Sequence, residues 1–251
     1  MSQKKEERLK KIRDILDQQE KVRISDLADE LHVTPETIRH DLNTLEEMNL
    51  VHREHGYVMG VSSLMELPFV MRGKEHVEDK RRIGWRAMSE IKDGMAVFLD
   101  AGSTTLAGLP YLTRRKDVTI VTTSLPLAYQ AARLNLNVIM CGGKVANVGL
   151  RTIGPEAIEM IRPFNFDIAI LGSDGISGVP GFTALDYTEV PIKHLIIQRA
   201  KYKIVVMDVS KFERKAACSF CTYDDIDMLV TGKLSGIQVD QVKGVKKIIQ
   251  L

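Results

Sequence analysis

The stretch VRISDLADELHVTPETIRHDLNTLEEMNLVHREHGYVM, residues 22–59, decides the fold of the first part of this 251-residue chain. Ser25 fits the N-cap of a short helix, and Thr34 followed by Pro35 starts a second helix after a tight turn. The apolar residues of the second helix recur at helical spacing, at Ile38, Leu42, Leu45 and Met48. This spacing predicts one buried stripe.

The other face of the second helix is polar and basic, and it carries Glu36, Thr37, Arg39, His40, Asn43 and Thr44. Arg, His, Asn and Thr side chains hydrogen-bond to phosphate oxygens and to base edges in a DNA major groove. Two helices joined by a short turn, with the second one polar at its tip, form a helix-turn-helix pattern. We expect DNA contacts from Ser25, Thr34, Thr37, Arg39, His40, Asn43, Arg53 and His55. The alternative is a small helical module that binds another protein or only supports the rest of the chain.

Two flanking segments complete this predicted domain. Residues 50–53 and 57–59 enclose a turn at 54–56, which predicts a hairpin wing that places Arg53 and His55 near a DNA phosphate. Residues 7–18 carry apolar side chains at helical spacing and complete a three-helix core, through Leu9, Ile12, Ile15 and Leu16.

The charge of the chain gives no indication of nucleic acid by itself. The formal net charge is +2, so the DNA prediction depends on where the charges lie. Basic residues gather near the start, at Lys4, Lys5, Arg8, Lys10, Lys11 and Arg13. Four of the six histidines lie in the same region, at positions 32, 40, 52 and 55. Their protonation below roughly pH 6.5 predicts tighter DNA binding.

These motifs resemble the N-terminal winged helix of DeoR-family transcriptional regulators. The resemblance is carried by Ile24-Ser25-Asp26-Leu27-Ala28, by Val33-Thr34-Pro35-Glu36-Thr37-Ile38-Arg39-His40-Asp41-Leu42, by Leu45-Glu46 and by His52-Arg53-Glu54-His55-Gly56. The family usually has a second arginine where this chain has His40, and Gly-Gly where it has Gly56-Tyr57. These differences do not affect the expected fold, but they bear on the strength and pH dependence of DNA contact.

From about residue 74 the pattern changes to short apolar runs that alternate with helices. We expect strands at 95–100, 118–122, 137–140, 167–171, 203–208, 228–231 and 246–249. Strands that are apolar throughout and separated by helices indicate an α/β domain with a mostly parallel sheet, covered on both faces. The predicted organisation is a winged helix-turn-helix domain (1–59), a linker (60–75) and an effector-sensing and oligomerisation domain (76–251).

Polar loops follow five of these strands, at 100–105, 122–124, 142–144, 172–175 and 208–212. Ligands bind at such strand ends in open α/β sheets. Backbone amides and hydroxyls at the start of a helix suit a phosphate group. Because five such loops converge on one edge of the sheet, they predict a small, phosphate-bearing ligand.

This half also resembles the DeoR family, whose C-terminal domain is similar to ribose-5-phosphate isomerase and senses phosphorylated sugars. The resemblance is carried by the loops at 100–105, 123–124, 142–143, 174–175, 181–183 and 208–212, and by Glu189. It implies an effector site made of Asp100, Gly102, Ser103, Thr104, Thr105, Thr123, Ser124, Gly143, Asp174, Gly175, Glu189 and Lys211. Ser103 to Thr105 and Ser124 would hold the phosphate, and the three carboxylates would take sugar hydroxyls. Lys144 and Lys193 are expected to be solvated surface lysines.

We therefore expect a DNA-binding regulator, a repressor of a sugar-metabolism operon, that acts as a homodimer or homotetramer without catalytic residues, metal or cofactor. A rival is a sugar-phosphate isomerase or deaminase that uses Asp100, Asp174, Glu189 and Lys211 with an accessory DNA-binding domain. A third interpretation is a redox or metal sensor built on Cys218-Ser-Phe-Cys221, although no second ligand pair is visible. No run approaches the ~20 apolar residues of a transmembrane helix, and the charged N-terminus favours a cytoplasmic protein.

Overall fold

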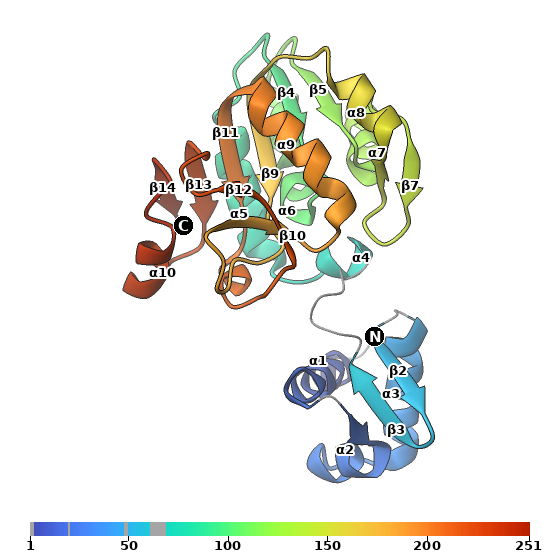
Figure 1. The fold of residues 1–251 in the computed structure, drawn as a ribbon. Helices are drawn as coiled ribbons and strands as arrows, with labels where there is room; N and C mark the ends of the chain where they lie inside the picture. Colours follow the sequence, from blue (N-terminus) through green and yellow to red (C-terminus); the bar gives the residue numbers. More distant parts are fainter. Residues whose placement is uncertain (1–2, 20, 48–49, 61–68) are drawn as a thin grey trace. The chain divides into compact units, whose positions relative to one another are not determined.

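The structure, a computed structural model, describes residues 3–19, 21–47, 50–60 and 69–251. The chain divides into two compact units, Met1–Met65 and Glu66–Leu251, and each has its own hydrophobic core (Figure 1). Within the described ranges, no helix is both long enough and apolar enough to cross a bilayer.

Three helices form the core of the first unit: α1 (Gln3–Gln18), α2 (Ile24–Glu30) and α3 (Pro35–Glu47). α1 begins earlier than predicted, and the position of Met48 lies outside the described residues. The apolar residues that the helical spacing singled out are buried, including Leu9, Ile12, Leu16, Leu27, Ile38, Leu42 and Leu45. The predicted three-helix core is therefore confirmed.

A small antiparallel sheet completes the first unit, with β1 (Val22–Arg23), β2 (Val51–Glu54) and β3 (Tyr57–Gly60) in the order β1-β3-β2. His55 and Gly56 form the turn between β2 and β3 with φ of 48° and 81°. A two-residue type I′ hairpin needs positive φ at both positions. The predicted wing is therefore present, and its turn is shorter by one residue than expected.

β1 was not predicted, and it changes how α2 begins. Arg23 pairs with Tyr57 in the sheet and has extended dihedrals (φ −74°, ψ 143°), so Arg23 is the N-cap and α2 starts at Ile24. The prediction that Ser25 caps this helix is wrong, because Ser25 lies inside the first turn and its hydroxyl donates to Asp26 at 3.0 Å. The prediction that Thr34 caps the second helix is confirmed, because the Thr34 hydroxyl accepts the Thr37 N–H of α3 at 3.2 Å.

The predicted linker, residues 60–75, is described only in part, because residues 61–68 lie outside the described residues. Its later part contains a one-turn helix, α4 (Phe69–Arg72), that belongs to the second unit. Phe69 is buried, and its N–H donates to the carbonyl of Val148 at 2.9 Å.

The second unit is built on a seven-stranded parallel sheet with the order β14-β13-β11-β9-β4-β5-β6 (Figure 1). Its strands are β4 (Ala96–Leu99), β5 (Thr119–Thr122), β6 (Asn137–Met140), β9 (Phe166–Gly172), β11 (Ala200–Val206), β13 (Met228–Thr231) and β14 (Ile248–Gln250). All seven coincide with apolar runs that predicted strands, so the fold class is confirmed.

Helices and single turns connect these strands, as expected for parallel pairing. α5 (Val77–Met88) precedes the first of these strands. The connecting elements are α6 (Ser103–Gly108), η1 (Leu109–Arg114), α7 (Leu125–Arg133), α8 (Pro155–Ile161), η2 (Tyr187–Glu189), α9 (Val190–Arg199), η3 (Val209–Phe212) and α10 (Gly236–Gln241). Two antiparallel strand pairs were not predicted: β7 (Lys144–Ala146) with β8 (Arg151–Ile153), and β10 (Gly181–Ala184) with β12 (Cys218–Thr222).

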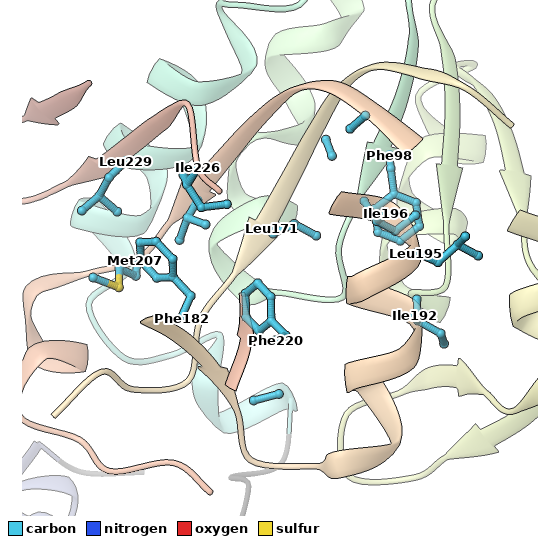
Figure 2. Packing of buried hydrophobic residues seen from close by; sticks show 14 of the residues in the cluster. Phe98, Leu171, Phe182, Ile192, Leu195, Ile196, Met207, Phe220, Ile226 and Leu229 are labelled. Carbon is cyan, nitrogen blue, oxygen red and sulfur yellow. The ribbon is translucent and has the colours of Figure 1, made fainter. Parts of the chain in front are cut away.

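The sheet is buried on both faces. On one face α8, α9 and the β10–β12 pair cover a cluster that includes Phe98, Leu171, Phe182, Ile196 and Phe220 (Figure 2). On the other face α5, η1 and α7 cover a cluster that includes Ile83, Leu112, Leu127, Ile170 and Val206. Burial on both faces explains why these strands read as continuous apolar runs.

A glycine pair brings α5 and α6 into backbone contact. A Cβ atom on Gly108 would lie 2.5 Å from the carbonyl carbon of Gly84, and one on Gly84 would lie 2.5 Å from the carbonyl oxygen of Thr104. Side chains at either position would therefore push the helices apart. This close approach fixes α6, and with it the hydroxyls at its start, against the ends of the central strands.

Candidate functional sites

The exposed face of α3 presents the polar residues that the sequence analysis assigned to DNA. Arg39, His40 and Asn43 are exposed, and Thr37 is half-buried beside the capping Thr34. The Arg39 guanidinium contacts Glu36 at 2.9 Å, with both side chains more than half exposed. Such a surface pair is worth at most about 1 kcal/mol. Arg39 can therefore exchange this carboxylate for a phosphate oxygen or a base edge at little cost.

A groove in the first unit brings four of the predicted DNA-contacting residues together. It is lined by Ile24, Ser25, Pro35, Arg39, Glu46, Arg53, His55 and Gly56. Ser25, Arg39, Arg53 and His55 thus share one surface formed by the starts of α2 and α3 and by the wing. Thr34, Thr37, His40 and Asn43 do not line this groove, although all four belong to α3 or to its cap.

Besides Arg39, two other arginines of this unit hold carboxylates within it. Arg53 donates through Nε to Glu46 at 2.8 Å, which ties the wing to α3. Arg8 forms a bidentate pair with the buried Asp41, which ties α1 to α3. Arg8 was grouped with the basic N-terminal cluster, and in the structure it holds α3 in place through Asp41.

A charged pocket lies at the carboxyl ends of the central strands β4, β9 and β11. It is lined by Arg72, Lys80, Asp100, Ala101, Gly102, Ser103, Thr104, Thr105, Gly172, Ser173, Asp174, Glu189, Lys193, Val206, Met207 and Lys211. Eight of the twelve predicted effector residues are among them: Asp100, Gly102, Ser103, Thr104, Thr105, Asp174, Glu189 and Lys211.

Buried ion pairs form one wall of this pocket. Lys193 is 4% exposed, and its ammonium donates to the carboxylate of Asp100 and to the carbonyl of Gly172 at 3.1 Å. It also lies 3.5 Å from Glu189, whose other oxygen is 2.7 Å from the guanidinium of Arg151. Acidic and basic side chains therefore alternate along this wall, from Asp100 after β4 through Lys193 and Glu189 to Arg151 on β8.

Burial and the neighbouring charges shift the pKa values of Glu189 and Lys193 in this wall. Burial raises the pKa of Glu189 to about 8, although Lys193 and Arg151 favour the charged form. Burial alone would lower the pKa of Lys193, but the carboxylates of Asp100 and Glu189 outweigh it and raise that pKa. Lys193 therefore stays charged and acts as the internal counter-ion of this wall.

The lining contains two further cations, Arg72 and Lys80. The Arg72 guanidinium lies 3.8 Å from Asp174, whose other oxygen accepts the Leu185 N–H at 2.9 Å. Burial would raise the pKa of Asp174, but Arg72 and this N–H outweigh it and lower that pKa. Lys80 donates to the backbone carbonyl of Arg72, and burial lowers the pKa of its ammonium.

Lys211 on η3 has the surroundings of an anion-binding lysine. It is 9% exposed and lines the pocket, yet among the described residues its ammonium makes no hydrogen bond. Burial and the nearby Arg214 lower its pKa to about 8, although Asp208 and Asp174 oppose this shift. Its positive charge at pH 7 is therefore held in a partly desolvated position where a ligand oxygen would stabilise it.

The start of α6 contributes the hydroxyls. Ser103, Thr104 and Thr105 occupy its first turn after Gly102, directly beyond Asp100 at the end of β4. The Thr105 hydroxyl is fully buried and has no hydrogen-bond partner among the described residues. The lining also contains four cationic and three carboxyl side chains. Such a pocket can bind an anion through its cations and hydroxyl groups through its carboxylates.

Four of the predicted effector residues do not line the pocket, and two of them belong to the loop after β5. Ser124 accepts the Leu127 N–H at 3.3 Å and so caps α7. Thr123 is buried, and its carbonyl accepts the N–H of Thr152 at 2.8 Å. Both residues are used to hold α7 and β8 at this strand end.

The other two are glycines required by close backbone packing. A Cβ atom on Gly143 would lie 2.6 Å from the carbonyl oxygen of Ile153, and its φ is +129°. A Cβ atom on Gly175 would lie 2.3 Å from the carbonyl oxygen of Arg214. The expectation that five strand-end loops converge is therefore corrected: the loops after β4, β9 and β11 form the pocket.

The sequence analysis missed three cationic residues of the lining: Arg72, Lys80 and Lys193. The expectation of a solvated Lys193 is wrong, because its ammonium is buried against Asp100 and Glu189. A signal was present, since Lys193 interrupts an apolar helix and follows Glu189 by four residues. Lys144 is exposed, as expected.

The cysteine pair has no metal-site geometry. Cys218 and Cys221 are free and lie on one strand, β12, whose pairing with β10 is irregular between the two cysteines. Burial raises the pKa of the Cys221 thiol to about 12, which disfavours a reactive thiolate. No group of three His, Cys, Asp or Glu side chains is placed to bind a metal ion in the described part of the chain.

Comparison with known proteins identifies both units. Residues 8–63 match the DeoR-like helix-turn-helix domain, and residues 75–233 match the DeoR C terminal sensor domain. The glycerol-3-phosphate regulon repressor of Escherichia coli (strain K12) is 31% identical over 91% of this chain and 91% of its own length. An uncharacterized HTH-type transcriptional regulator, FruR of Bacillus subtilis (strain 168), is 30% identical over 86% of this chain and 88% of its own length.

Among solved structures, the chain is similar to ribose 5-phosphate isomerase from Plasmodium falciparum, with 21% identity, a TM-score of 0.38, and coverage of 53% of this chain and 51% of that one. The sequence relatives match both units along nearly their whole length. The chain belongs to the DeoR family and is a helix-turn-helix transcriptional regulator with a C-terminal sensor domain.

Proposed function

We propose that this protein represses genes of sugar metabolism and that a phosphorylated sugar, or a related small phosphate ester, controls its affinity for operator DNA. The observation that carries the proposal is the charged pocket at the ends of β4, β9 and β11. A relative of matching length is named a glycerol-3-phosphate regulon repressor, which supports both the repression and the phosphate-bearing ligand. We place its action in the cytoplasm, where DNA and sugar phosphates occur together.

The proposed ligand contacts follow from the chemistry of the lining side chains. Lys211 and the first turn of α6, with Ser103 and Thr105, hold the phosphate through charge and hydroxyl donors. Asp174 and Glu189 accept hydrogen bonds from ligand hydroxyls, and Lys193 keeps the acidic wall neutralised. A neutral sugar would leave Lys211 desolvated without an anion, so the phosphate is the recognised group.

The DNA end uses α3 as the recognition helix and the wing as a backbone contact. A homodimer, or a homotetramer built from dimers, places two recognition helices in successive major grooves about 34 Å apart, or a multiple of that distance. Arg39, His40 and Asn43 read or position the DNA, and Arg53 and His55 contact the backbone. Ligand binding shifts the protomer arrangement, and coupling of about 1–3 kcal/mol changes DNA affinity roughly 5- to 150-fold.

The rival function is an enzyme that turns over sugar phosphates with Asp100, Asp174, Glu189 and Lys211. We propose binding without turnover, because Asp100 and Glu189 are held by Lys193 inside the protein wall. A turnover assay with sn-glycerol 3-phosphate, D-ribose 5-phosphate, D-fructose 1-phosphate and D-fructose 6-phosphate separates the two functions. Product formation that is lost on Glu189→Gln substitution would establish the enzyme.

The proposed function is tested by fluorescence anisotropy with the DNA upstream of the protein's own gene. We expect salt-sensitive binding that at least one of these four compounds changes fivefold or more. Lys211→Ala and Ser103→Ala should bind DNA normally and lose this response. Lys144→Ala, which removes an exposed lysine, should retain it. Full retention of the response in both pocket variants would refute the assigned pocket.

A further inference from the structure

Three side chains on the outer face of the small sheet form a cluster: Lys21, Arg23 and Tyr57. Arg23 on β1 is paired with Tyr57 on β3, and its Nε donates to the Tyr57 hydroxyl oxygen at 2.8 Å. The Arg23 guanidinium carbon lies 5.3 Å from the centre of the Tyr57 ring, and the Lys21 ammonium lies 4.6 Å from it. Both distances are within the roughly 6 Å of a cation–π contact. One tyrosine therefore contacts two cations.

The alternation of side chains along the strands explains why this cluster lies outside the core. Val22 and Val58 are paired in register, and both are buried. Successive residues of a strand point to opposite faces, so Arg23 and Tyr57 point away from the core. Lys21 lies two residues before Arg23, and both side chains are exposed. The small sheet therefore presents two positive charges to solvent.

Neither cation of the cluster forms an ion pair with a carboxylate among the residues that the structure describes. The hydrogen bond with Tyr57 raises the pKa of Arg23, and Asp26 adds a smaller effect of the same sign. By contrast, the Arg39 guanidinium pairs with Glu36 on the recognition helix. The two charges of the cluster are therefore not neutralised within this unit.

The cluster borders the groove that collects four of the predicted DNA contacts. Tyr57 directly follows the wing turn, and Arg23 directly precedes Ile24 at the start of α2. The Ile24 N–H donates to the Gly56 carbonyl at 3.1 Å, and both residues line the groove. The cluster and the groove are therefore joined through neighbouring residues of the same unit.

The remaining donors of Arg23 suit a DNA phosphate. Its hydrogen bond to Tyr57 uses Nε, which leaves the N–H groups of both Nη atoms for an acceptor. Arginine donates to phosphate oxygens through such N–H groups, and lysine acts on a phosphate as a point charge. Because the Tyr57 ring already restricts both side chains, less conformational entropy is lost when they bind.

We infer that Lys21, Arg23 and Tyr57 form a second phosphate-binding site for operator DNA beside the groove. Lys21 and Arg23 each neutralise one backbone phosphate, and Tyr57 is a positioning residue that holds them. The DNA contacts expected from the sequence include none of these three residues. The inference rests on the proposed DNA contact of this unit and adds a contact outside the recognition helix. It does not depend on the ligand of the second unit.

The salt dependence of DNA affinity tests the two cations. Lys21→Ala and Arg23→Ala should each lower the slope of log K against log[salt] by about 0.9 for each protomer bound, the effect of losing one phosphate contact. Each should weaken binding of the upstream DNA and of an unrelated duplex by a similar factor, because phosphate contacts carry no sequence information. Lys144→Ala removes the same charge from an exposed position of the second unit and should keep the wild-type slope.

Both cation variants should unfold at the wild-type temperature. Lys21 is exposed, and the Arg23 side chain makes no capping hydrogen bond to α2. A change in the salt slope therefore reports on DNA contact and not on folding.

A double-mutant cycle tests the role of Tyr57. Tyr57→Phe keeps the ring and removes the hydroxyl to which Arg23 donates. It should weaken DNA binding about two- to tenfold in the wild-type background and have no further effect in Arg23→Ala. If the wild type shows no salt-sensitive DNA binding, the proposed function fails and the inference fails with it. If the wild type binds DNA but either cation variant keeps the wild-type slope, or Tyr57→Phe has the same effect in both backgrounds, only the inference is overturned.

Discussion

Replacing Lys193 by methionine tests whether the buried ionic wall organises the sensor pocket. Methionine keeps a similar length and apolar stem but removes the charge. The ammonium of Lys193 is then missing beside Asp100 and Glu189, and the Gly172 carbonyl loses a donor at 3.1 Å. Glu189 keeps Arg151 at 2.7 Å, so the main loss falls on Asp100.

The expected cost is large because both partners are buried. The side chains of Lys193 and Asp100 are 5% and 8% exposed, and removing one partner of such a pair typically costs about 3–5 kcal/mol. At 1.4 kcal/mol per tenfold change, the unfolding equilibrium constant should rise roughly 100- to 4,000-fold. The pKa of Lys193 is raised in the folded protein above its ordinary value of 10.5. The charged ammonium therefore contributes its full stabilisation below pH 10.5, and this contribution is lost only as the pH rises through the higher pKa of the folded state. A measurement at pH 7.5 therefore captures the whole effect.

Urea unfolding followed by tryptophan fluorescence measures this cost for the second unit alone. The chain has one tryptophan, Trp85, and it lies on α5. Lys201→Met is the matched control, because Lys201 pairs with Asp167 at 2.9 Å but is 76% exposed. An exposed pair of this kind contributes about 0–1 kcal/mol. If Lys193→Met destabilises the unit by no more than Lys201→Met does, the argument from burial is refuted.

Three further predictions concern DNA contact, packing and pH. Arg39→Ala should weaken operator binding tenfold or more, with the thermal unfolding temperature unchanged; normal affinity in anisotropy titrations would exclude its role. Gly108→Ala should destabilise the second unit by about 1–3 kcal/mol in the Trp85 assay, because its Cβ would lie 2.5 Å from Gly84, and an unchanged midpoint would contradict this packing. Binding of sn-glycerol 3-phosphate or the responsive sugar phosphate should weaken between pH 7 and 9 in calorimetric titrations, since Lys211 loses its charge near pH 8 and Glu189 gains one near the same pH. An affinity that rises over this interval would show that neither group faces the anion.

The first unit was largely predictable because its signals are local. Ile38 and Leu42 repeat at helical spacing, Thr34-Pro35 marks a helix start, and both features are present in the structure. The two-residue strand β1 was missed because two residues show no periodicity. That strand, by pairing Arg23 with Tyr57, set the start of α2 one residue before the apparent cap at Ser25.

In the second unit, local patterns predicted the strands and the polar loops but not which charges are buried. Lys144 and Lys193 look alike as single residues in the sequence. Lys193 is buried against Asp100, which lies 93 positions earlier in the chain, and the two meet only when α9 packs against β9. The burial of a charge depends on such long-range pairing, so no spacing within α9 was enough to decide it.

The order of strands in the sheet decides which loops share a ligand. Along the chain, β5 pairs with one edge of β4, and β6 extends the sheet on that side. The chain then crosses back, so that β9 pairs with the other edge of β4 and β11 extends the sheet in the opposite direction. With adjacent strands about 4.8 Å apart, the end of β6 lies roughly 14 Å from the end of β9, beyond the reach of one small phosphate ester. The reversal between β4 and β9 is a topological switch point, where open α/β sheets bind ligands. A small ligand held between the Asp100 loop after β4 and the Asp174 loop after β9 therefore lies out of reach of the Gly143 loop after β6, whatever sugar it carries.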